Sequence, residues 1–212
     1  MEKFSDHFLK ANSGPIWKKD NRYLGLSHHE MPDLIMLTYP RSGRHWLYWN
    51  ILTNTDLRVN SFHGIEEGVN MEYYKNNISV PIATVVRSPE ECIASINTME
   101  HHSQSKERIE GYIDHYEFVL KHSDMFFLYE DLREKTPQIL DILCEKYGGK
   151  VIKSNSNFNE YKEWYKATQN PFKLITSKDS PIYQDALFST KSINLDKHKE
   201  LYLAAKDKCV IL

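Results

Sequence analysis

The sequence predicts an α/β fold, a three-layer sandwich in which a central parallel sheet lies between helices. Short apolar runs typical of buried strands alternate with stretches of helical periodicity. Two of these runs end directly at a turn that opens a helix, which is typical of strand–helix units wound around a parallel sheet. The 212 residues, 41% of them hydrophobic, suffice for a single domain with its own core.

The expected elements follow one another along the chain as strand and helix. Leu34–Tyr39 (LIMLTY) has the pattern of a buried strand, and Gly43–Asn54 that of a helix. A second strand, Ile82–Val86, leads into Ser88–Glu91, where a serine N-cap, a first-turn proline and a capping-box glutamate open another helix. The remaining expected elements are a helix over Ile109–Lys121, a strand over Met125–Tyr129, a helix over Leu132–Tyr147 and a last helix over Asp196–Asp207.

The domain is expected to have three parts: a core over residues 31–149, a small irregular lobe over 150–193 and a C-terminal helix within 194–212. The stretch Lys150–Lys178 is rich in Asn, Ser, Lys and aromatic residues and has weak periodicity, which indicates loops. Its aromatic residues would either line an acceptor pocket or form the lobe's own small core; they are Phe158, Tyr161, Trp164, Tyr165 and Phe172.

Charge and cysteine content narrow the class of protein. With 27 basic and 29 acidic residues, the formal charge of −2 gives no reason to expect a nucleic acid partner. The start of the chain does not read as a signal peptide, and no apolar run is long enough to span a membrane. Three scattered cysteines indicate a reducing, cytoplasmic setting. The ending Cys209–Leu212 fits a prenylation pattern, but we expect it to pack on the core instead.

The segment Pro40–His45 follows the first strand and must turn sharply into a helix. Backbone N–H groups and the positive end of the helix dipole then converge on one small volume, which favours an anion. Arg41 adds a planar donor fork, and Ser42 adds a hydroxyl. The Lys-Ser/Thr pair of a standard nucleotide-hydrolase loop is missing after Gly43, which disfavours an ATP or GTP hydrolase.

Three segments together resemble the PAPS-dependent sulfotransferases. Thr38–Trp46 (TYPRSGRHW) is similar to the family's phosphosulfate loop TYPKSGTTW at six of nine positions. Arg87–Ser95 is similar to the later element RNPxDxxxS, with the distance from arginine to serine kept. Tyr129–Asp131 matches the YED that follows a hydrophobic strand in the family.

The resemblance implies a fold like that of the P-loop NTPases, PAPS as co-substrate and no metal. Arg41 would bridge the 5′-phosphate and the sulfonate, Arg87 and Ser95 would bind the 3′-phosphate, and Trp46 and Tyr129 would lie near the adenine. The full set of implied donor-binding residues is Arg41, Ser42, Gly43, Arg44, His45, Trp46, Arg87, Ser95 and Tyr129.

Histidines supply the candidate base. His63 lies between the two donor loops, in Ser61-Phe62-His63 where the family has KTH, and is expected to accept the acceptor's proton. His45 is the second candidate, and Arg41 would stabilise leaving-group charge. The family's late RKGxxGDW segment has only Lys191–Asn194 as a counterpart. The cluster His101-His102, with His115 and His122 further on, is expected to be polar helix surface.

The function these residues predict is transfer of a sulfuryl group from PAPS to a hydroxyl or amine of a small-molecule or carbohydrate acceptor, with PAP as product. One alternative is a P-loop kinase of small molecules or nucleosides, which would need magnesium and ATP. The other alternative is a PAP- or PAPS-binding protein without catalytic activity. Two differences from the family favour it: the lysine of KTH is missing, and the late segment is altered.

Overall fold

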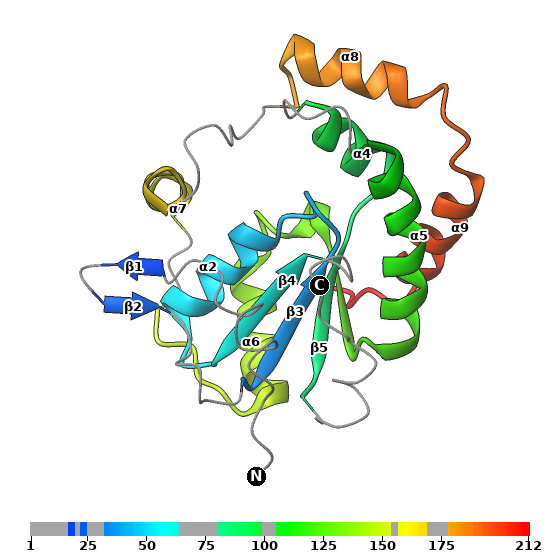
Figure 1. Cartoon of the computed structure of the whole chain (residues 1–212). Helices are drawn as coiled ribbons and strands as arrows, with labels where there is room; N and C mark the ends of the chain where they lie inside the picture. Colours follow the sequence, from blue (N-terminus) through cyan, green and yellow to red (C-terminus); the bar gives the residue numbers. More distant parts are fainter. Residues whose placement is uncertain are drawn as a thin grey trace, which may run out of the picture.

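The computed structural model describes residues 17–19, 22–24, 32–63, 80–98, 105–153, 157–168 and 178–212. A four-stranded parallel sheet with the strand order β4-β3-β5-β6 lies at its centre (Figure 1). These strands are β3 (Leu34–Thr38), β4 (Val59–His63), β5 (Ile82–Val86) and β6 (Met125–Leu128). A separate antiparallel pair consists of β1 (Trp17–Lys19) and β2 (Arg22–Leu24).

The sheet reverses its direction of growth between β3 and β5. The chain runs from β3 to β4 at one edge, then returns to add β5 on the other side of β3, followed by β6. In open parallel sheets, ligands bind beyond the carboxyl ends of the two strands that flank such a reversal. Tyr39 follows β3 at this end, and Arg87 follows β5. The topology therefore selects these two connections as the expected place for a ligand.

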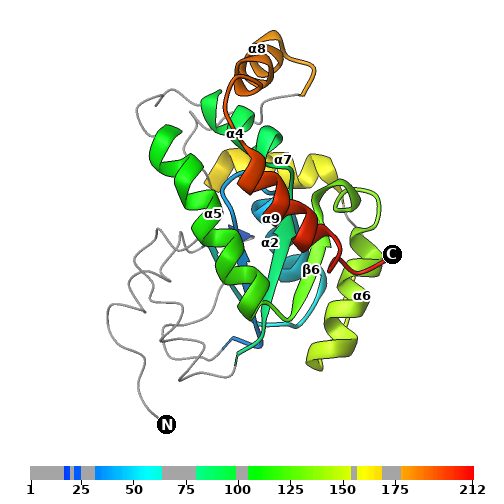
Figure 2. The same cartoon turned by 90° about the vertical axis from the view of Figure 1, so that its right-hand side faces the viewer.

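Helices cover both faces of the sheet (Figures 1 and 2). Two strand connections run in opposite directions across the sheet, and right-handed crossovers then lie on opposite faces. Accordingly, α2, which connects β3 to β4, packs with α6 on one face of the sheet. The helices α4 and α5, which lie between β5 and β6, pack with α9 on the other face. These helices are α2 (Arg44–Asn54), α4 (Pro89–Asn97), α5 (Ser105–His122), α6 (Thr136–Tyr147) and α9 (Asp196–Lys206).

Alternating strand residues fill two separate cores. Leu34 and Met36 of β3 face α2 and α6, whereas Ile35 and Leu37 face the layer of α4, α5 and α9. All four are at most 1% exposed. Because both faces of the sheet are covered, the strands have the continuous apolar runs that were read from the sequence.

The prediction of an α/β fold is confirmed. The structure differs from the predicted elements by one additional strand and in where some elements begin and end. The sheet contains an additional strand, β4, which pairs with β3 in register from Leu34 opposite Val59 to Thr38 opposite His63. Tyr129 was expected to end a strand, but Tyr129–Asp131 forms a short 3-10 helix, and the following helix begins at Thr136 rather than at Leu132. Pro137 in the first turn explains the later start.

The stretch 150–193, expected to be irregular, contains two helices, α7 (Phe158–Thr168) and α8 (Pro181–Thr190). Ser180 caps α8, since its side chain accepts a hydrogen bond from the backbone N–H of Tyr183 at 3.2 Å, and Pro181 occupies the first turn. This start signal was present in the sequence and was missed because the apolar periodicity of α8 is weak.

His115 was expected on a polar helix surface, and that prediction was wrong. Its side chain is 1% exposed and lies against the rings of Tyr39 and Tyr116, at centroid distances of 5.8 and 5.3 Å. It faces the sheet because α5 packs over β5 with this side. His101 and His102 lie outside the described residues.

The end of the chain packs against the sheet. The backbone of Cys209 bridges to Phe126 of β6, and the N–H of Val210 donates to the Phe126 carbonyl at 3.0 Å. Cys209 and Val210 therefore pack as expected for the segment Cys209–Leu212, whereas Ile211 is 96% exposed. None of the helices in the described ranges combines the length and apolarity needed to cross a membrane.

Candidate functional site

The loop after β3 has two residues in the left-handed backbone region. Arg41 has φ of 69° and Gly43 has φ of 85°, and the N–H of Ser42 donates to the Tyr39 carbonyl at 3.2 Å. Gly43 then serves as the N-cap of α2, and its carbonyl accepts the N–H of Trp46 at 3.1 Å. The strand therefore turns into the helix over the five residues Tyr39–Gly43, the sharp turn that the sequence predicts.

Gly43 is required at this turn for space as well as for backbone freedom. A Cβ atom on Gly43 would lie 2.6 Å from Cδ1 of Leu132 and 3.0 Å from ring atoms of Tyr129. The YED segment thus packs directly on the loop. Tyr129 was predicted to lie near the adenine. In the structure its ring packs against Gly43 and thereby fixes the position of the loop.

Arg87 lies at the carboxyl end of β5 and is 4% exposed. Its Nη1 donates to the main-chain carbonyl of Arg41 at 2.6 Å, and its Nε donates to Glu91 at 2.9 Å. Nη2 contacts the hydroxyl of Tyr183 at 3.5 Å, and the guanidinium carbon lies 4.0 Å from the ring centre of Tyr129. Burial of a charge in this way is tolerated because each of its nitrogens has a partner.

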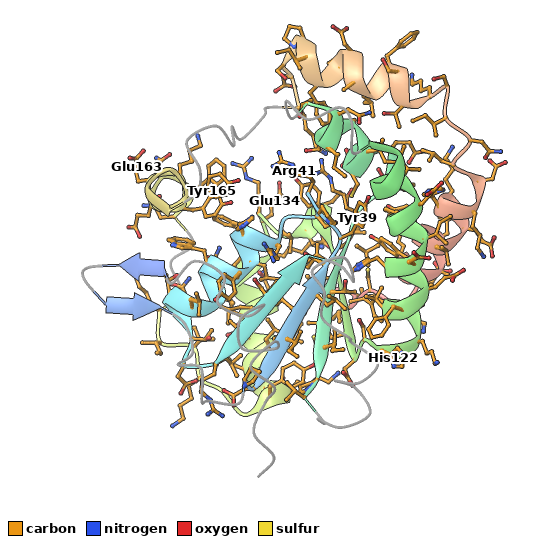
Figure 3. All side chains as sticks on the ribbon, in the orientation of Figure 1. Tyr39, Arg41, His122, Glu134, Glu163 and Tyr165 are labelled. Atoms are coloured by element: carbon orange, nitrogen blue, oxygen red, sulfur yellow. The ribbon has the colours of Figure 1, made fainter. Side chains whose placement is uncertain are left out.

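Arg41 connects three elements above the sheet. Its Nε donates to Oγ of Ser95 on α4 at 2.8 Å. The hydroxyl of Tyr165 on α7 also lies near the Arg41 side chain, and Figure 3 shows Tyr165 approaching Arg41 from that helix. Burial raises the pKa of Tyr165, and the nearby Arg41 offsets this only in part. The two loops predicted to grip one nucleotide are therefore in contact.

Glu91 balances the charge of this cluster. Its Oε1 accepts a hydrogen bond from Lys178 at 2.5 Å, and its other oxygen accepts from Arg87. Burial by itself would raise the pKa of Glu91, but the bonds from Lys178 and Arg87 outweigh it, so the pKa is lowered. Lys178 and Arg87 are thus two cations paired with one carboxylate, which leaves a surplus of positive charge.

The chemistry of these groups fits a ligand with phosphate groups. A guanidinium carries five N–H donors, and the contacts of Arg87 with Glu91, Arg41 and Tyr183 use three of them within the described part of the chain. Two donors are left for ligand oxygens. Ser95 adds a hydroxyl, and Lys178 adds an ammonium group on a side chain that is 47% exposed, at the same edge.

Lys178 and Tyr183 were not predicted from the sequence, and Tyr165 was predicted as an acceptor-pocket or lobe-core residue but not as a neighbour of Arg41. Tyr183 reaches Arg87 from the first turn of α8, Lys178 reaches Glu91 from just before that helix, and Tyr165 approaches Arg41 from α7. The serine-proline start of α8 was the one local signal that placed a helix there. In contrast, Lys191–Asn194, the expected counterpart of the late family segment, forms the turn after α8.

Trp46 lies in the core between α2, α6 and α7. It is 6% exposed, and its indole N–H donates to the Leu132 carbonyl at 2.8 Å. Its ring contacts those of Trp49, Phe158 and Tyr161 at centroid distances of 5.9, 5.6 and 5.1 Å. Stacking of an adenine on Trp46 therefore requires displacement of α7 residues from its ring.

The other loop residues point in different directions. Ser42 is fully buried, and its hydroxyl lies 3.6 Å from Sγ of Cys92. Nη1 of Arg44 donates to the carbonyl of Ser61 on β4 at 3.2 Å. The ring of His45 lies 5.5 Å from that of Tyr165 and perpendicular to it. Of these three, His45 is the one placed beside the Arg41–Tyr165 contact.

The backbone of His63 ends β4 at the same edge of the sheet. It pairs in register with Thr38, two residues before Pro40 of the loop. Parallel strands end together, so this register brings His63 to the carboxyl edge beside the loop. Its side chain lies outside the described part of the structure, as do the side chain of Trp164 and the whole of Phe172.

Within the described ranges, no group of three or more His, Cys, Asp or Glu side chains is arranged to hold a metal ion. Comparison with known proteins adds no relative: no protein-family model and no curated protein sequence matches this chain.

Proposed function

We propose that this protein is a PAPS-dependent sulfotransferase with a fold like that of the P-loop NTPases. The observation that supports the proposal most strongly is the contact between the two predicted donor loops: the buried Arg87 guanidinium donates to the carbonyl of Arg41. The contact lies where the strand order reverses, beside Ser95 and Lys178. A nucleotide with phosphates at both its 5′ and 3′ positions would match two adjacent basic loops.

The residues would divide the chemistry as follows. The phosphosulfate of PAPS supplies the SO3 group, which passes to an oxygen or nitrogen of a small-molecule or carbohydrate acceptor while PAP leaves. Charge accumulates on the leaving phosphate, and Arg41 lies on the loop that would stabilise it. His63 would take the proton that the acceptor loses, with His45 as the second candidate. Positioning and charge stabilisation account for the catalysis in this scheme.

The three cysteines, Cys92, Cys144 and Cys209, are free thiols in the structure. Burial raises the pKa of Cys92 to about 11, so this thiol remains protonated although it lies next to Ser42. Free cysteines in a folded domain favour a reducing compartment. We infer a cytoplasmic location on this ground.

Thermal unfolding with added nucleotides tests the proposal. A ligand that binds the folded state raises the melting temperature by mass action. We expect PAP without metal to raise it more than equal concentrations of ATP with magnesium. Stabilisation by ATP and magnesium alone would instead favour the kinase alternative. Transfer of labelled sulfate from PAPS to a set of acceptors then separates an enzyme from a PAP-binding protein without activity.

A further inference from the structure

The backbone of Arg87 lies at a position where strand pairing has ended. The ladder between β5 and β6 pairs Ala83–Val86 with Met125–Leu128, so Arg87 is one residue beyond it. Arg87 is 4% exposed, and its N–H and carbonyl are enclosed by α5. Buried backbone groups without a partner are costly, so this junction needs partners from outside the sheet.

Two tyrosines of α5 meet this requirement. The hydroxyl of Tyr116 accepts the N–H of Arg87 at 3.1 Å and lies 3.3 Å from its carbonyl oxygen. The hydroxyl of Tyr112 donates to the same carbonyl at 3.0 Å. The backbone N–H and the backbone carbonyl of Arg87 are thus both hydrogen-bonded to side chains of α5. We refer to Tyr112 and Tyr116 as the tyrosine clamp.

The clamp is rigid and keeps its protons. The two rings stack at a centroid distance of 4.2 Å with an angle of 18° between their planes, and neither side chain is more than 1% exposed. Burial raises the pKa of both phenols far above the ordinary value of a tyrosine. Both hydroxyls therefore stay neutral at any pH at which the protein is used, and Tyr112 remains a donor.

The clamp also touches the first loop. The ring of Tyr39, which opens the loop, packs edge-on against Tyr112 at a centroid distance of 4.8 Å. The carbonyl of Tyr39 in turn accepts the N–H of Ser42. One helix face therefore supports both connections, the segment Tyr39–Ser42 through ring packing and Arg87 through hydrogen bonds.

We propose that Tyr112 and Tyr116 are positioning residues that hold the Arg87 junction against the first loop and thereby set the site's preference for a nucleotide with a 3′-phosphate. The inference rests on the proposed function, since it assumes that Arg87 meets the 3′-phosphate. Removing a clamp hydroxyl leaves the charge of the site unchanged. Its effect on binding therefore has to come from the placement of Arg87.

The test compares two ligands that differ by the 3′-phosphate alone, PAP and adenosine 5′-monophosphate. For Tyr116→Phe we expect PAP binding to weaken about tenfold, because a buried N–H loses its partner and the guanidinium shifts, while binding of the monophosphate changes less than about twofold. Tyr112→Phe is expected to act in the same direction but less, because Tyr116 still contacts the carbonyl. The preference for PAP is a readout that a general loss of stability would not change.

Tyr147→Phe is the matched control. Tyr147 also has an enclosed hydroxyl, one that has no hydrogen-bond partner within the described residues, and it lies on α6 at the other face of the sheet. Its removal should leave both affinities at the wild-type level. Residue-resolved hydrogen exchange of the Arg87 amide gives a second readout, which should accelerate in Tyr116→Phe and remain unchanged in Tyr147→Phe.

The outcomes separate the two proposals. If both clamp variants keep the wild-type preference for PAP, the positioning role is wrong. If the wild-type protein shows no preference for PAP, the assignment of Arg87 to a 3′-phosphate fails, and amide exchange alone decides whether the clamp holds this junction. Equal exchange at Arg87 in wild type and Tyr116→Phe would then overturn the clamp as well.

Discussion

Nη1 of Arg87 and the main-chain carbonyl oxygen of Arg41 lie 2.6 Å apart, which joins the connection after β5 to the connection after β3. The bond is formed by a charged donor at a buried position, where such bonds are strong. It fixes one basic residue relative to the backbone of the other. The two loops therefore act as one structural unit, and changes in either should affect the same ligand.

Replacement of Gly43 tests how tightly the loop is packed. Gly43→Ala should destabilise the fold by about 2 to 4 kcal/mol, because the new methyl group meets Leu132 and Tyr129 and the left-handed backbone adds strain. Gly148→Ala is the matched control, since Gly148 also has positive φ but nothing within 4 Å of a Cβ. It should cost about 1 kcal/mol. Urea unfolding measures both, and equal losses would contradict the packing argument.

Lys178 is expected to contribute to ligand binding more than to stability. The Lys178–Glu91 pair is partly exposed, so Lys178→Gln should change the free energy of unfolding by less than about 1 kcal/mol. The affinity for PAP should fall about tenfold, because the site loses a cation. Lys197→Gln removes a comparable surface pair with Glu200 and should not alter the affinity. Calorimetric titration decides, and equal affinities in the two variants would exclude Lys178 from the site.

His115 should make the fold sensitive to acid. Burial holds its pKa down at about 3 in the folded protein, whereas the unfolded chain has the ordinary value of about 6.5. Between these values only the unfolded state binds the proton, so stability is complete above about pH 6.5 and falls by about 1.4 kcal/mol per pH unit below it.

The variant His115→Leu should lose this part of the pH dependence. Between pH 7 and pH 5 the wild type should lose about 2 kcal/mol more stability than the variant. Urea unfolding at the two pH values measures the difference. Identical losses in the two proteins would mean that His115 gains a proton without unfolding.

His63 is predicted to act in catalysis and not in donor binding. His63→Ala should lower the rate of sulfate transfer by about a hundredfold or more while PAP affinity is retained. His45→Ala provides the comparison, because His45 lies on the donor loop and its loss should affect binding as well. A fully active His63→Ala enzyme would show that another group takes the proton.

The parts of the site that were predicted correctly from the sequence depend on local signals. A buried strand followed by a glycine turn predicts the loop at Gly43, and the capping residues Ser88 and Pro89 predict the start of α4, which places Arg87 at its strand end. These patterns are short, and the backbone preferences of glycine and proline determine them directly.

The parts that were missed depend on packing between distant segments. Arg87 and Tyr183 are 96 residues apart in sequence, and Lys178 and Glu91 are 87 apart. No periodicity links such positions, because tertiary packing of α8 and the residues before it against α4 brings them together. His115 shows the same limit, since a single histidine within a polar helix reads as surface until the covered face of that helix is known.

Phosphorus NMR of PAP during titration with the protein tests the central claim most directly, because its two phosphates give separate signals. We expect both signals to shift with wild-type protein in the absence of metal. Arg87→Gln should remove mainly the response of the 3′-phosphate, and Arg41→Gln mainly that of the 5′-phosphate. Unchanged signals of PAP, with clear shifts of ATP in the presence of magnesium, would contradict the claim that this site binds a sulfate donor.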